Sequence, residues 1–280
     1  MMKLPQFAVD DLIRRAVEED MNYLDVTTDY LIEEHQRGTG VLLAKASGIL
    51  CGLDIALRVF TLLDPTAQFQ VFKKDGDPLQ KGEIIAEINA CTRNLLKGER
   101  TALNLIQHLS GIATATHECV KMVEGTGASI ADTRKTLPGL RSLQKYAVTC
   151  GGGKNHRFNL SDAAMLKDNH IDAGGGILAA TQKLREQLGH TVKIEVETRN
   201  LDEVRQAVEA GADIIMFDNM DNQTMREAVG IVNKAAKTEA SGGITKETLR
   251  AVAETGVDII SIGALTHSVK AFDISMKIHA

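Results

Sequence analysis

The stretch VKIEVETRNLDEVRQAVEAGADIIMFDN, residues 192–219, carries two short apolar runs separated by one amphipathic segment. The runs cover 192–198 and 213–219, and the segment 201–211 between them has helical spacing and ends in glycine, the residue that most often follows a helix. An apolar strand, a helix and a second apolar strand are typical of a β/α unit with a parallel sheet. The stretch therefore predicts an α/β fold.

The same alternation of apolar runs and helical segments continues on both sides of this stretch. Further apolar runs occur at 128–134, 163–169, 237–244 and 258–265, and a second helical segment covers 246–256. The last four runs start 21 to 24 residues apart, as successive β/α units do. Every run ends in polar residues or glycine, which favours the rim of a closed barrel over an open doubly wound sheet that uses two or three strand ends. We predict an incomplete (β/α) barrel at 106–269, with six strands and room for a seventh.

The first hundred residues follow a different pattern. β-like runs lie at 40–46, 67–74 and 83–90, and helical segments lie at 8–20, 54–63 and 94–123. Asp10 is a candidate N-cap of the first helix, and Ser110-Gly111 is a candidate break in the last. Clustered strands with separate helices predict an α+β layer, and we assign 1–105 to an N-terminal α/β sandwich domain.

Composition restricts the function. The formal charge is −5, hydrophobic residues make up 44% of the chain, and no apolar run is long enough to cross a bilayer. The N-terminal segment has acidic residues where a signal peptide needs an apolar core, and no long basic run suggests nucleic-acid binding. The cysteines Cys51, Cys91, Cys119 and Cys150 form no C-x-x-C pair, and no His/Cys cluster has zinc-site spacing. We expect a cytoplasmic enzyme that binds neither nucleic acid nor a membrane.

Residues 132–170 hold a local excess of positive charge in this acidic chain. The basic residues of the stretch are Arg134, Lys135, Arg141, Lys145, Lys154, Arg157 and Lys167. The triple glycine at 151–153 lets the backbone approach a ligand closely, beside His156 and Arg157. A local cluster of cations steers and binds anions. We predict a site here for a small, multiply charged anion.

Acidic residues at two neighbouring strand ends are candidates for a metal or a sugar. Glu197 and Asp218 lie 21 residues apart, so we expect them at equivalent positions on adjacent strands. They suit Mg²⁺ or ribose hydroxyls; the alternative is a salt-bridged pair that neutralises the basic stretch. Glu195 lies two residues before Glu197, so on a strand both side chains point to the same face, and Glu195 competes for this assignment.

Lys167, His156 and two glycine loops each have more than one interpretation. Lys167 at a strand end suits either anion binding or a Schiff base. His156 suits a general base or, preferably, a hydrogen-bond donor to a carboxylate. Ser241-Gly242-Gly243 and Ile262-Gly263-Ala264 follow the last two strands, where barrels commonly bind phosphate; tight βα turns are the alternative.

Long motifs resemble the quinolinate phosphoribosyltransferase family. They occur at 24–31, 98–114, 131–162, 166–171, 195–198, 216–220, 239–244 and 261–268, and include the run KYAV followed by GGG and NHR. A related molybdenum-transport-associated family shares the fold but typically lacks that run. The resemblance covers most of the chain.

The resemblance implies a reaction of quinolinate with phosphoribosyl pyrophosphate and Mg²⁺, giving nicotinate mononucleotide, pyrophosphate and CO₂ for NAD biosynthesis. It implies catalytic roles for Lys135, Lys167, Glu197 and Asp218, with the last two binding Mg²⁺ directly or through water or substrate. The substrate-binding set would be Arg100, Thr133, Arg134, Lys135, His156, Arg157, Lys167, Glu197, Asp218, Ser241, Gly242, Gly243, Ile262, Gly263 and Ala264.

The resemblance also implies a homodimer, or a higher oligomer of dimers. The resemblance places Arg100 across the subunit interface and returns 270–280 to the N-terminal domain. Two other classes remain open: a Schiff-base aldolase that uses Lys167, and a regulatory module that binds phosphoribosyl pyrophosphate without turnover.

Overall fold

The computed structural model describes residues 4–279, which form two compact units. Unit 1 contains the described residues up to His117, together with Ser142–Gly152 and the residues from Ser268 onward. Unit 2 contains Glu118–Arg141 and Gly153–His267. The domain boundary at residue 105 stays a prediction, and contacts group 106–117 and 142–152 with unit 1.

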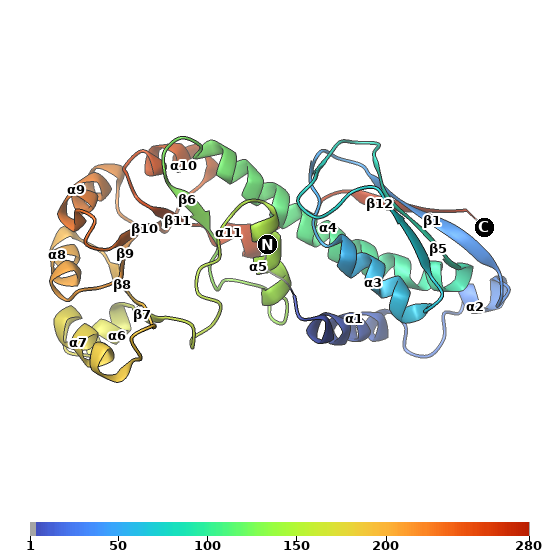
Figure 1. Ribbon diagram of the computed structural model, residues 1–280, viewed down its shortest axis with the longest axis horizontal. Coiled ribbons are helices and arrows are strands. Elements are labelled where there is room, and N and C mark those ends of the chain that lie inside the picture. The colour runs from blue at the N-terminus through green and yellow to red at the C-terminus, as the bar shows by residue number, and fades with distance from the viewer. Residues whose placement is uncertain (1–3, 280) are drawn as a thin grey trace. The chain divides into compact units, whose positions relative to one another are not determined.

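Unit 1 is an α+β layer built on an antiparallel sheet (Figure 1). Its strands are β1 (Arg37–Ala44), β2 (Gly48–Ile49), β3 (Gln68–Val71), β4 (Pro78–Leu79), β5 (Ile84–Cys91) and β12 (Ile274–His279). Its helices are α1 (Gln6–Asp20), α2 (Thr28–Leu31), α3 (Leu53–Leu63), most of α4 (Thr92–Met122) and most of α5 (Arg141–Cys150). The main sheet has the order β12-β1-β5-β3, and β2 pairs with β4. The C-terminal strand β12 pairs with β1 and so belongs to this unit.

Fully buried side chains of β1, β5, α3 and α4 form the core of unit 1. Leu42, Phe60, Ile88, Leu95 and Ile106 are each 0% exposed. Alternate residues of β1 are buried, the pattern of a strand with one face toward a core. This burial provides the main driving force for the fold of the unit.

Two local predictions for unit 1 were wrong. Helix α4 runs through Ser110-Gly111 without a break, because tertiary contacts use both residues: the Ser110 hydroxyl accepts from the Cys51 amide at 2.9 Å, and a Cβ on Gly111 would lie 2.3 Å from the Lys270 carbonyl oxygen. Helix α1 begins earlier than expected, with Pro5 as its N-cap. Asp10 lies inside that helix and forms an ion pair with Arg58 at 2.7 Å.

Unit 2 is an arc of six parallel strands with helices on its outer side (Figure 1). Its strands are β6 (Ser129–Ala131), β7 (Ala164–Leu166), β8 (Ile194–Thr198), β9 (Ile214–Asp218), β10 (Lys237–Ser241) and β11 (Ile259–Ser261). Its helices are α6 (Asp168–Ala173), α7 (Ile177–Gln187), α8 (Leu201–Glu209), α9 (Asn222–Val232), α10 (Lys246–Ala253) and α11 (Ala264–His267). The strand order is β6-β11-β10-β9-β8-β7.

The incomplete barrel is confirmed, but the closed rim was wrong. The sheet is open between β6 and β7, the two ends of the strand order. Lys154 adds a single parallel bridge to Ala131 at the outer edge of β6, and the chain from 155 to 163 then forms loops and turns. Within residues 4–279, the seventh position is therefore one isolated bridge rather than a strand.

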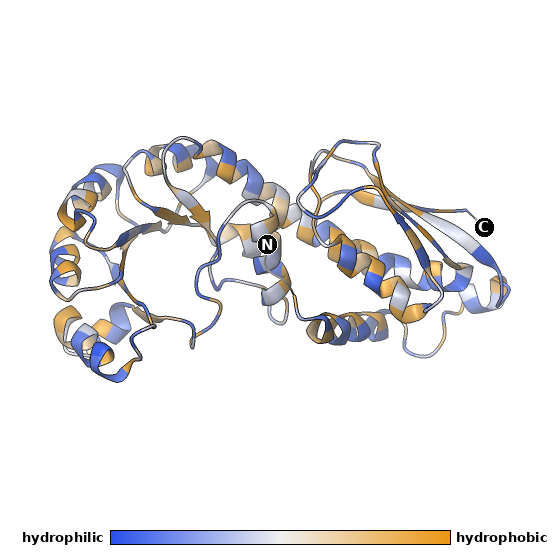
Figure 2. Ribbon diagram, viewed as in Figure 1, coloured by the Kyte–Doolittle hydropathy of each residue, from blue (hydrophilic) through white to orange (hydrophobic). Residues whose placement is uncertain are grey.

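Local signals explain the β/α units of unit 2. The three central residues of β9 and of β10 are buried, as expected where helices cover a parallel sheet. Asn200 caps α8 by accepting from the Glu203 amide at 2.9 Å, and Asp221 caps α9 through the amides of Gln223 and Thr224. Figure 2 shows hydrophobic and hydrophilic residues alternating along α8, α9 and α10, which is typical of helices with one buried face.

Within the described part of the chain, no helix combines the length and the hydropathy that crossing a bilayer requires.

Candidate active site

A cavity of about 540 Å³ lies at the carboxyl ends of the strands in unit 2. All six strands, or the segments that follow them, contribute to it, because the carboxyl ends of parallel strands meet at one edge of the sheet. The lining residues are Thr133, Arg134, Lys135, His156, Arg157, Met165, Lys167, Glu197, Met216, Asp218, Asn219, Glu239, Ser241, Gly242, Gly243 and Ser261. The structure thus brings together most of the residues that the sequence singled out.

The second glycine loop and Arg100 do not line this cavity. Residues 262–264 lie beside it: a Cβ on Gly263 would be 3.0 Å from the Lys135 side chain, and the Thr266 hydroxyl donates to the Lys135 carbonyl at 2.8 Å. Helix α11 therefore holds the loop that carries Lys135. Arg100 is an exposed residue of α4 in unit 1.

Two arginines of the cavity repel each other, and one of them has a buried donor without a partner. Arg157 donates from Nη1 to the Ala163 carbonyl at 2.9 Å. Burial lowers the pKa of Arg157, and the nearby charge of Arg134 lowers it further. The Nε of Arg134 is buried and has no hydrogen-bond partner. Two like charges held together, one with an unmatched donor, form a place where an anion would be stabilised.

Asp132 fixes the loop that carries the cations. This residue is 0% exposed at the end of β6. Its carboxylate accepts from the His156 amide at 2.9 Å and from the Asn155 side chain at 2.6 Å. The buried carboxylate therefore positions the backbone of the segment that leads into Arg157.

The ring of His156 faces two buried carboxylates. Its Nδ1 accepts from the Arg157 amide at 2.8 Å, so the proton of the neutral ring lies on Nε2. Nε2 lies 3.0 Å from the Glu195 carboxylate and 3.5 Å from that of Glu239. In this geometry Nε2 points at Glu195 and Glu239, and the preferred role of His156 as a donor to a ligand carboxylate stays a prediction.

Glu195 and Glu239 form an acidic pair at the floor of the cavity, which Glu239 lines, and each is only 1% exposed. Burial and the charge of Glu195 together raise the pKa of Glu239 to about 7, although His156 and a hydrogen bond with Ser261 lower it. One oxygen of Glu239 is buried without a hydrogen-bond partner. Sequence reasoning missed Glu239. It lies two residues before Ser241 on β10, and residues two apart on a strand face the same side of the sheet, so this spacing could have revealed it.

Glu195 and Glu197 share a face of β8 but have different surroundings. Glu197 lies nearer the mouth, where it lines the cavity and accepts a hydrogen bond from the Lys167 ammonium group. Glu195 lies one pleat deeper, against His156. The cavity therefore favours Glu197 over Glu195 as the residue that reaches a ligand.

The expected alignment of Glu197 with Asp218 was wrong by two residues. The register pairs Glu197 with Met216, so Asp218 lies farther toward the carboxyl end of its strand. Tilted strands of a curved parallel sheet are staggered, and equal sequence spacing does not imply equal height. Both carboxylates still line the cavity.

Lys167 is an ion-paired lysine rather than a desolvated one. Its side chain is 44% exposed and pairs with Glu197, whose side chain is 15% exposed. A Schiff-base lysine needs a low-dielectric pocket that favours its neutral form. Lys167 is instead part-exposed and held in an ion pair with Glu197, so its geometry suits anion binding.

The loop Ser241-Gly242-Gly243 requires glycine. Gly242 has φ +94°, and a Cβ there would lie 2.3 Å from the Asn219 side-chain oxygen. The loop follows β10 and precedes α10, whose N-cap is Thr245. A glycine loop before a helix N-terminus is the geometry that barrels use to bind phosphate.

A second cavity, of about 560 Å³, lies at the amino ends of the same strands. Its carboxylates are already paired: Asp213 with Arg185 at 3.0 Å and Lys193 at 2.8 Å, and Asp258 with Lys237 at 2.7 Å. Volume does not distinguish the two cavities. The paired charges identify the amino end as a structural surface, and we place the candidate site at the carboxyl end.

Spatial groups of possible metal ligands occur in both units. Among the described residues they are His156 with Glu195 and Glu239, and Cys51 with Asp75 and Cys150. The sequence spacing that argued against zinc revealed neither group, because the members of each group come from distant segments.

Comparisons with known proteins cover nearly the whole chain. Residues 25–110 match the model of the quinolinate phosphoribosyl transferase N-terminal domain, and residues 112–277 match that of the C-terminal domain. A probable nicotinate-nucleotide pyrophosphorylase (carboxylating) of Bacillus subtilis is 51% identical over 93% of this chain and 90% of its own length. The Mycobacterium leprae nicotinate-nucleotide pyrophosphorylase (carboxylating) is 41% identical over 97% of each chain. The crystal structure of NadC from Streptococcus pyogenes has a TM-score of 0.96 and 41% identity, covering 100% of this chain and 99% of that one.

Proposed function

The chain belongs to the quinolinate phosphoribosyltransferase family, and from that premise we propose how its residues perform the reaction. The enzyme transfers the phosphoribosyl group of phosphoribosyl pyrophosphate to quinolinate with decarboxylation, giving nicotinate mononucleotide, pyrophosphate and CO₂ in NAD biosynthesis. The observation that carries the assignment to this cavity is the cluster of cations around an unmatched arginine donor at the carboxyl ends of the strands.

The cationic side of the cavity binds quinolinate. Two adjacent carboxylates need several donors in fixed geometry, and Arg134, Arg157 and Lys167 line one cavity. Lys135, His156 and Thr133 complete the set that we assign to this side. Pairing between guanidinium and carboxylate groups orients the pyridine ring, so that its nitrogen can face the anomeric carbon.

The acidic and glycine-rich side binds the phosphoribosyl group. Glu197 and Asp218 hold the ribose hydroxyls and stabilise positive charge on the sugar as the bond to pyrophosphate breaks. The loop at Ser241–Gly243 takes the 5′-phosphate through backbone N–H groups, and residues 262–264 support that end of the site. The ring nitrogen bonds to the anomeric carbon as pyrophosphate leaves.

Decarboxylation follows from the new positive charge on the ring nitrogen. The bond from C2 to its carboxylate breaks, CO₂ leaves, and the electron pair left on C2 is stabilised by the adjacent nitrogen until a proton replaces it. This step needs no lysine imine, in agreement with the ion-paired state of Lys167. Turnover would exclude the binding-only regulatory module.

Mg²⁺ is the metal that we assign to this reaction. Its usual sites combine one or two carboxylates with substrate phosphates, and Glu197 and Asp218 supply carboxylates at the mouth of the cavity. When bound, Mg²⁺ neutralises charge on the pyrophosphate leaving group. The carboxylates bind it directly or through water and substrate.

Comparison of quinolinate with nicotinate tests this function. With phosphoribosyl pyrophosphate and Mg²⁺, quinolinate should give nicotinate mononucleotide and one CO₂, whereas nicotinate, with a single carboxylate, should react poorly. Comparable rates with the two acids would refute the assignment. Glu197→Gln should lower turnover with little change in quinolinate affinity; loss of quinolinate binding alone would show that the carboxylate is misplaced.

We also propose a homodimer in the cytoplasm, or a larger assembly of such dimers. Unit 1 exposes large apolar side chains near its start: Phe7, Tyr23, Val26, Tyr30 and Leu31. Clusters of exposed apolar residues mark interaction surfaces. All four cysteines lie in the described chain and none is in a disulfide, which suits a reducing compartment.

Arg100 completes the site of the partner subunit in this proposal. Its side chain is exposed and forms no ion pair or side-chain hydrogen bond with residues 4–279. Arg100→Ala and Lys135→Ala should each inactivate the enzyme, whereas a mixed dimer places both defects in one site and leaves the other intact. After random reassociation of equal amounts, about a quarter of wild-type activity should return, because half the dimers are mixed. No recovery despite demonstrated subunit exchange would show that Arg100 does not act in trans.

A further inference from the structure

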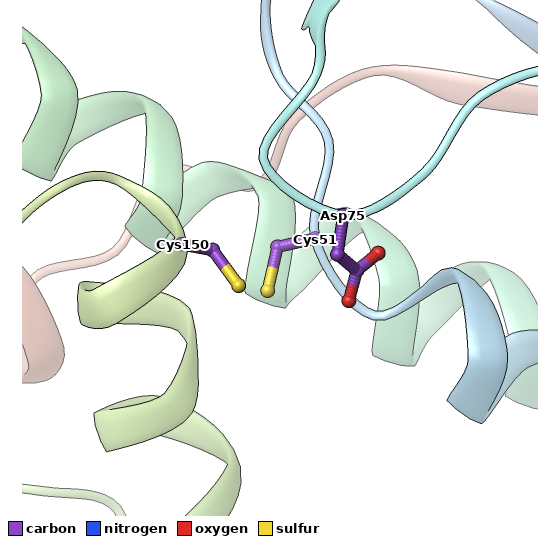
Figure 3. Close-up of side chains that lie close together, drawn as sticks. All are labelled: Cys51, Asp75 and Cys150. Carbon is purple, nitrogen blue, oxygen red and sulfur yellow. The ribbon is translucent and has the colours of Figure 1, made fainter. Parts of the chain in front are cut away.

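Three potential metal ligands meet inside unit 1, and none of them lines the cavity described above. Cys51 precedes α3, Asp75 lies between β3 and β4, and Cys150 ends α5. Their ligating atoms all lie within 4.8 Å of one another. Figure 3 shows the two sulfur atoms directed toward each other, with the Asp75 carboxylate beside Cys51. Cys51 is 0% exposed and Cys150 is 8% exposed, so the cluster is buried at its sulfur end.

The carboxylate of the cluster is held in place by three donors. The amides of Gly52 and Leu53 donate to Asp75 at 2.8 and 3.0 Å, and the Tyr146 hydroxyl donates at 2.7 Å. Oδ2 accepts two of these bonds and Oδ1 accepts one, so Oδ1 keeps a lone pair. Metal-binding carboxylates are typically oriented by such surrounding hydrogen bonds.

The local electrostatics disfavour negative charge until a cation arrives. Burial raises the pKa of the Cys51 thiol well above its usual value, and the hydrogen bond with Cys150 and the charge of Asp75 raise it further. Burial also raises the pKa of Asp75. A divalent cation would reverse this balance by replacing the thiol protons.

We propose that Cys51, Asp75 and Cys150 bind one Zn²⁺, or a cation of similar softness, with water as a fourth ligand. Two thiolates and one carboxylate suit a tetrahedral zinc site, and thiolates select such a cation over Mg²⁺. A Zn–S distance of about 2.3 Å places two sulfurs about 3.8 Å apart, so the 4.8 Å limit on the present separations requires only small shifts. Each thiol releases one proton to solvent on binding.

A disulfide between Cys51 and Cys150 explains the cluster less well. It would need a two-electron oxidant, such as a low-molecular-weight disulfide, and a thiolate to attack it. Cys51 is 0% exposed, so an oxidant in solution has little access to its sulfur. A disulfide also gives no role to Asp75 or to the three hydrogen bonds that orient it.

The site would join three segments of unit 1. It would connect the start of α3, the β3–β4 loop and the end of α5, which directly precedes the glycines at 151–153. Because a cation that binds only the folded chain stabilises it, Zn²⁺ should raise the Tm of the metal-free protein. This effect does not depend on the phosphoribosyl transfer reaction.

Cobalt spectroscopy on the full-length, metal-free protein tests the proposal. We expect one equivalent of Co²⁺ to give a thiolate-to-cobalt charge-transfer band that one equivalent of Zn²⁺ abolishes. Cys51→Ser and Cys150→Ser should lose the band, and Tyr146→Phe, which keeps the ring but removes the donor to Asp75, should weaken binding about 10- to 100-fold. Cys119→Ser removes a different buried thiol and should leave the band intact.

The wild-type spectrum alone can overturn the proposal, whatever the stability of the variants. A wild-type protein without a thiolate band has no such site. A band that survives Cys51→Ser or Cys150→Ser in variants with native circular dichroism also refutes it. If treatment with a disulfide oxidant links Cys51 to Cys150 while the reduced protein takes up no metal, the pair is a redox pair instead.

Discussion

The two ends of the strands in unit 2 carry cavities of nearly equal volume, about 540 Å³ at the carboxyl end and about 560 Å³ at the amino end. At the amino end, Asp213 and Asp258 are each paired with lysine or arginine. At the carboxyl end, Arg134 and Glu239 each keep a buried polar atom without a hydrogen-bond partner. The difference teaches that unmatched polar groups, rather than volume, locate a binding site.

The pKa values at the two ends shift in opposite directions. Burial raises the pKa of Asp213, but hydrogen bonds from Lys193, the Ile194 amide and Arg185 outweigh it, and the net value is lowered. At the carboxyl end, burial and Glu195 raise the pKa of Glu239 to about 7. The amino end therefore stabilises the charge of Asp213 in the free protein, whereas Glu239 at the carboxyl end lacks enough compensation.

The largest expected effect is on activity at the carboxyl end. Arg157→Ala removes a charged donor from the quinolinate side and leaves a ligand carboxylate unmatched, which should cost about 3 to 4 kcal/mol of transition-state binding, or two to three orders of magnitude in kcat/KM. Lys193→Ala at the amino end is the matched control and should leave kcat/KM unchanged. Similar losses in both variants would erase the distinction between the two ends.

Glu239→Gln should change how stability depends on pH. The folded pKa of about 7 exceeds the usual value of 4.5, so the native state binds more protons between these values and loses stability as pH rises through them. Gln does not titrate and therefore removes this loss. From pH 4.5 to pH 8, the free energy of unfolding of the variant should rise by about 2 to 3 kcal/mol relative to that of the wild type. Chemical unfolding across that range measures the difference. If the difference in unfolding free energy between the variant and the wild type stays constant across this pH range, the raised pKa of Glu239 is contradicted.

Asp213→Asn should cost about 1 to 2 kcal/mol of unfolding free energy near neutral pH and leave kcat/KM unchanged. The pKa of Asp213 is lowered in the folded state. Its carboxylate therefore contributes to stability above the unfolded-state pKa near 3.8, and this contribution disappears as pH falls through the folded-state pKa. The stability difference should therefore shrink in acid. Loss of activity without loss of stability would instead implicate the amino end in binding.

The sequence predicts the order of strands and helices along the chain better than the contacts between distant segments. Apolar runs such as 213–219 become buried strands because a covered parallel sheet needs them, and the polar residues that follow them meet at one rim. Helix α4 runs through Ser110-Gly111 because partners from distant segments occupy both positions, which no local signal reveals. The stagger between Glu197 and Asp218 depends in the same way on strand tilt.

The candidate site shows the same limit. Arg157 could be found because positive charges gather at 132–170 in an acidic chain, and Lys167 because a charge at the end of an apolar run is unusual. The strand pattern would have placed Glu239 on the cavity side, but its contact with His156 and the direction of the His156 ring could not be predicted, because both depend on which side chains meet under the rim. Cys51 and Cys150 lie far apart in the chain, and only the tertiary fold of unit 1 brings them together.

A crystal structure with quinolinate bound tests most directly the claim that the carboxyl-end cavity is the site of reaction. We predict that both quinolinate carboxylates contact Arg134, Arg157 or Lys167, that Arg134 Nε gains an acceptor, and that the ring nitrogen is open toward Glu197 and Asp218. Quinolinate bound in the amino-end cavity, or bound at the carboxyl end without contact to these cations, would contradict the account.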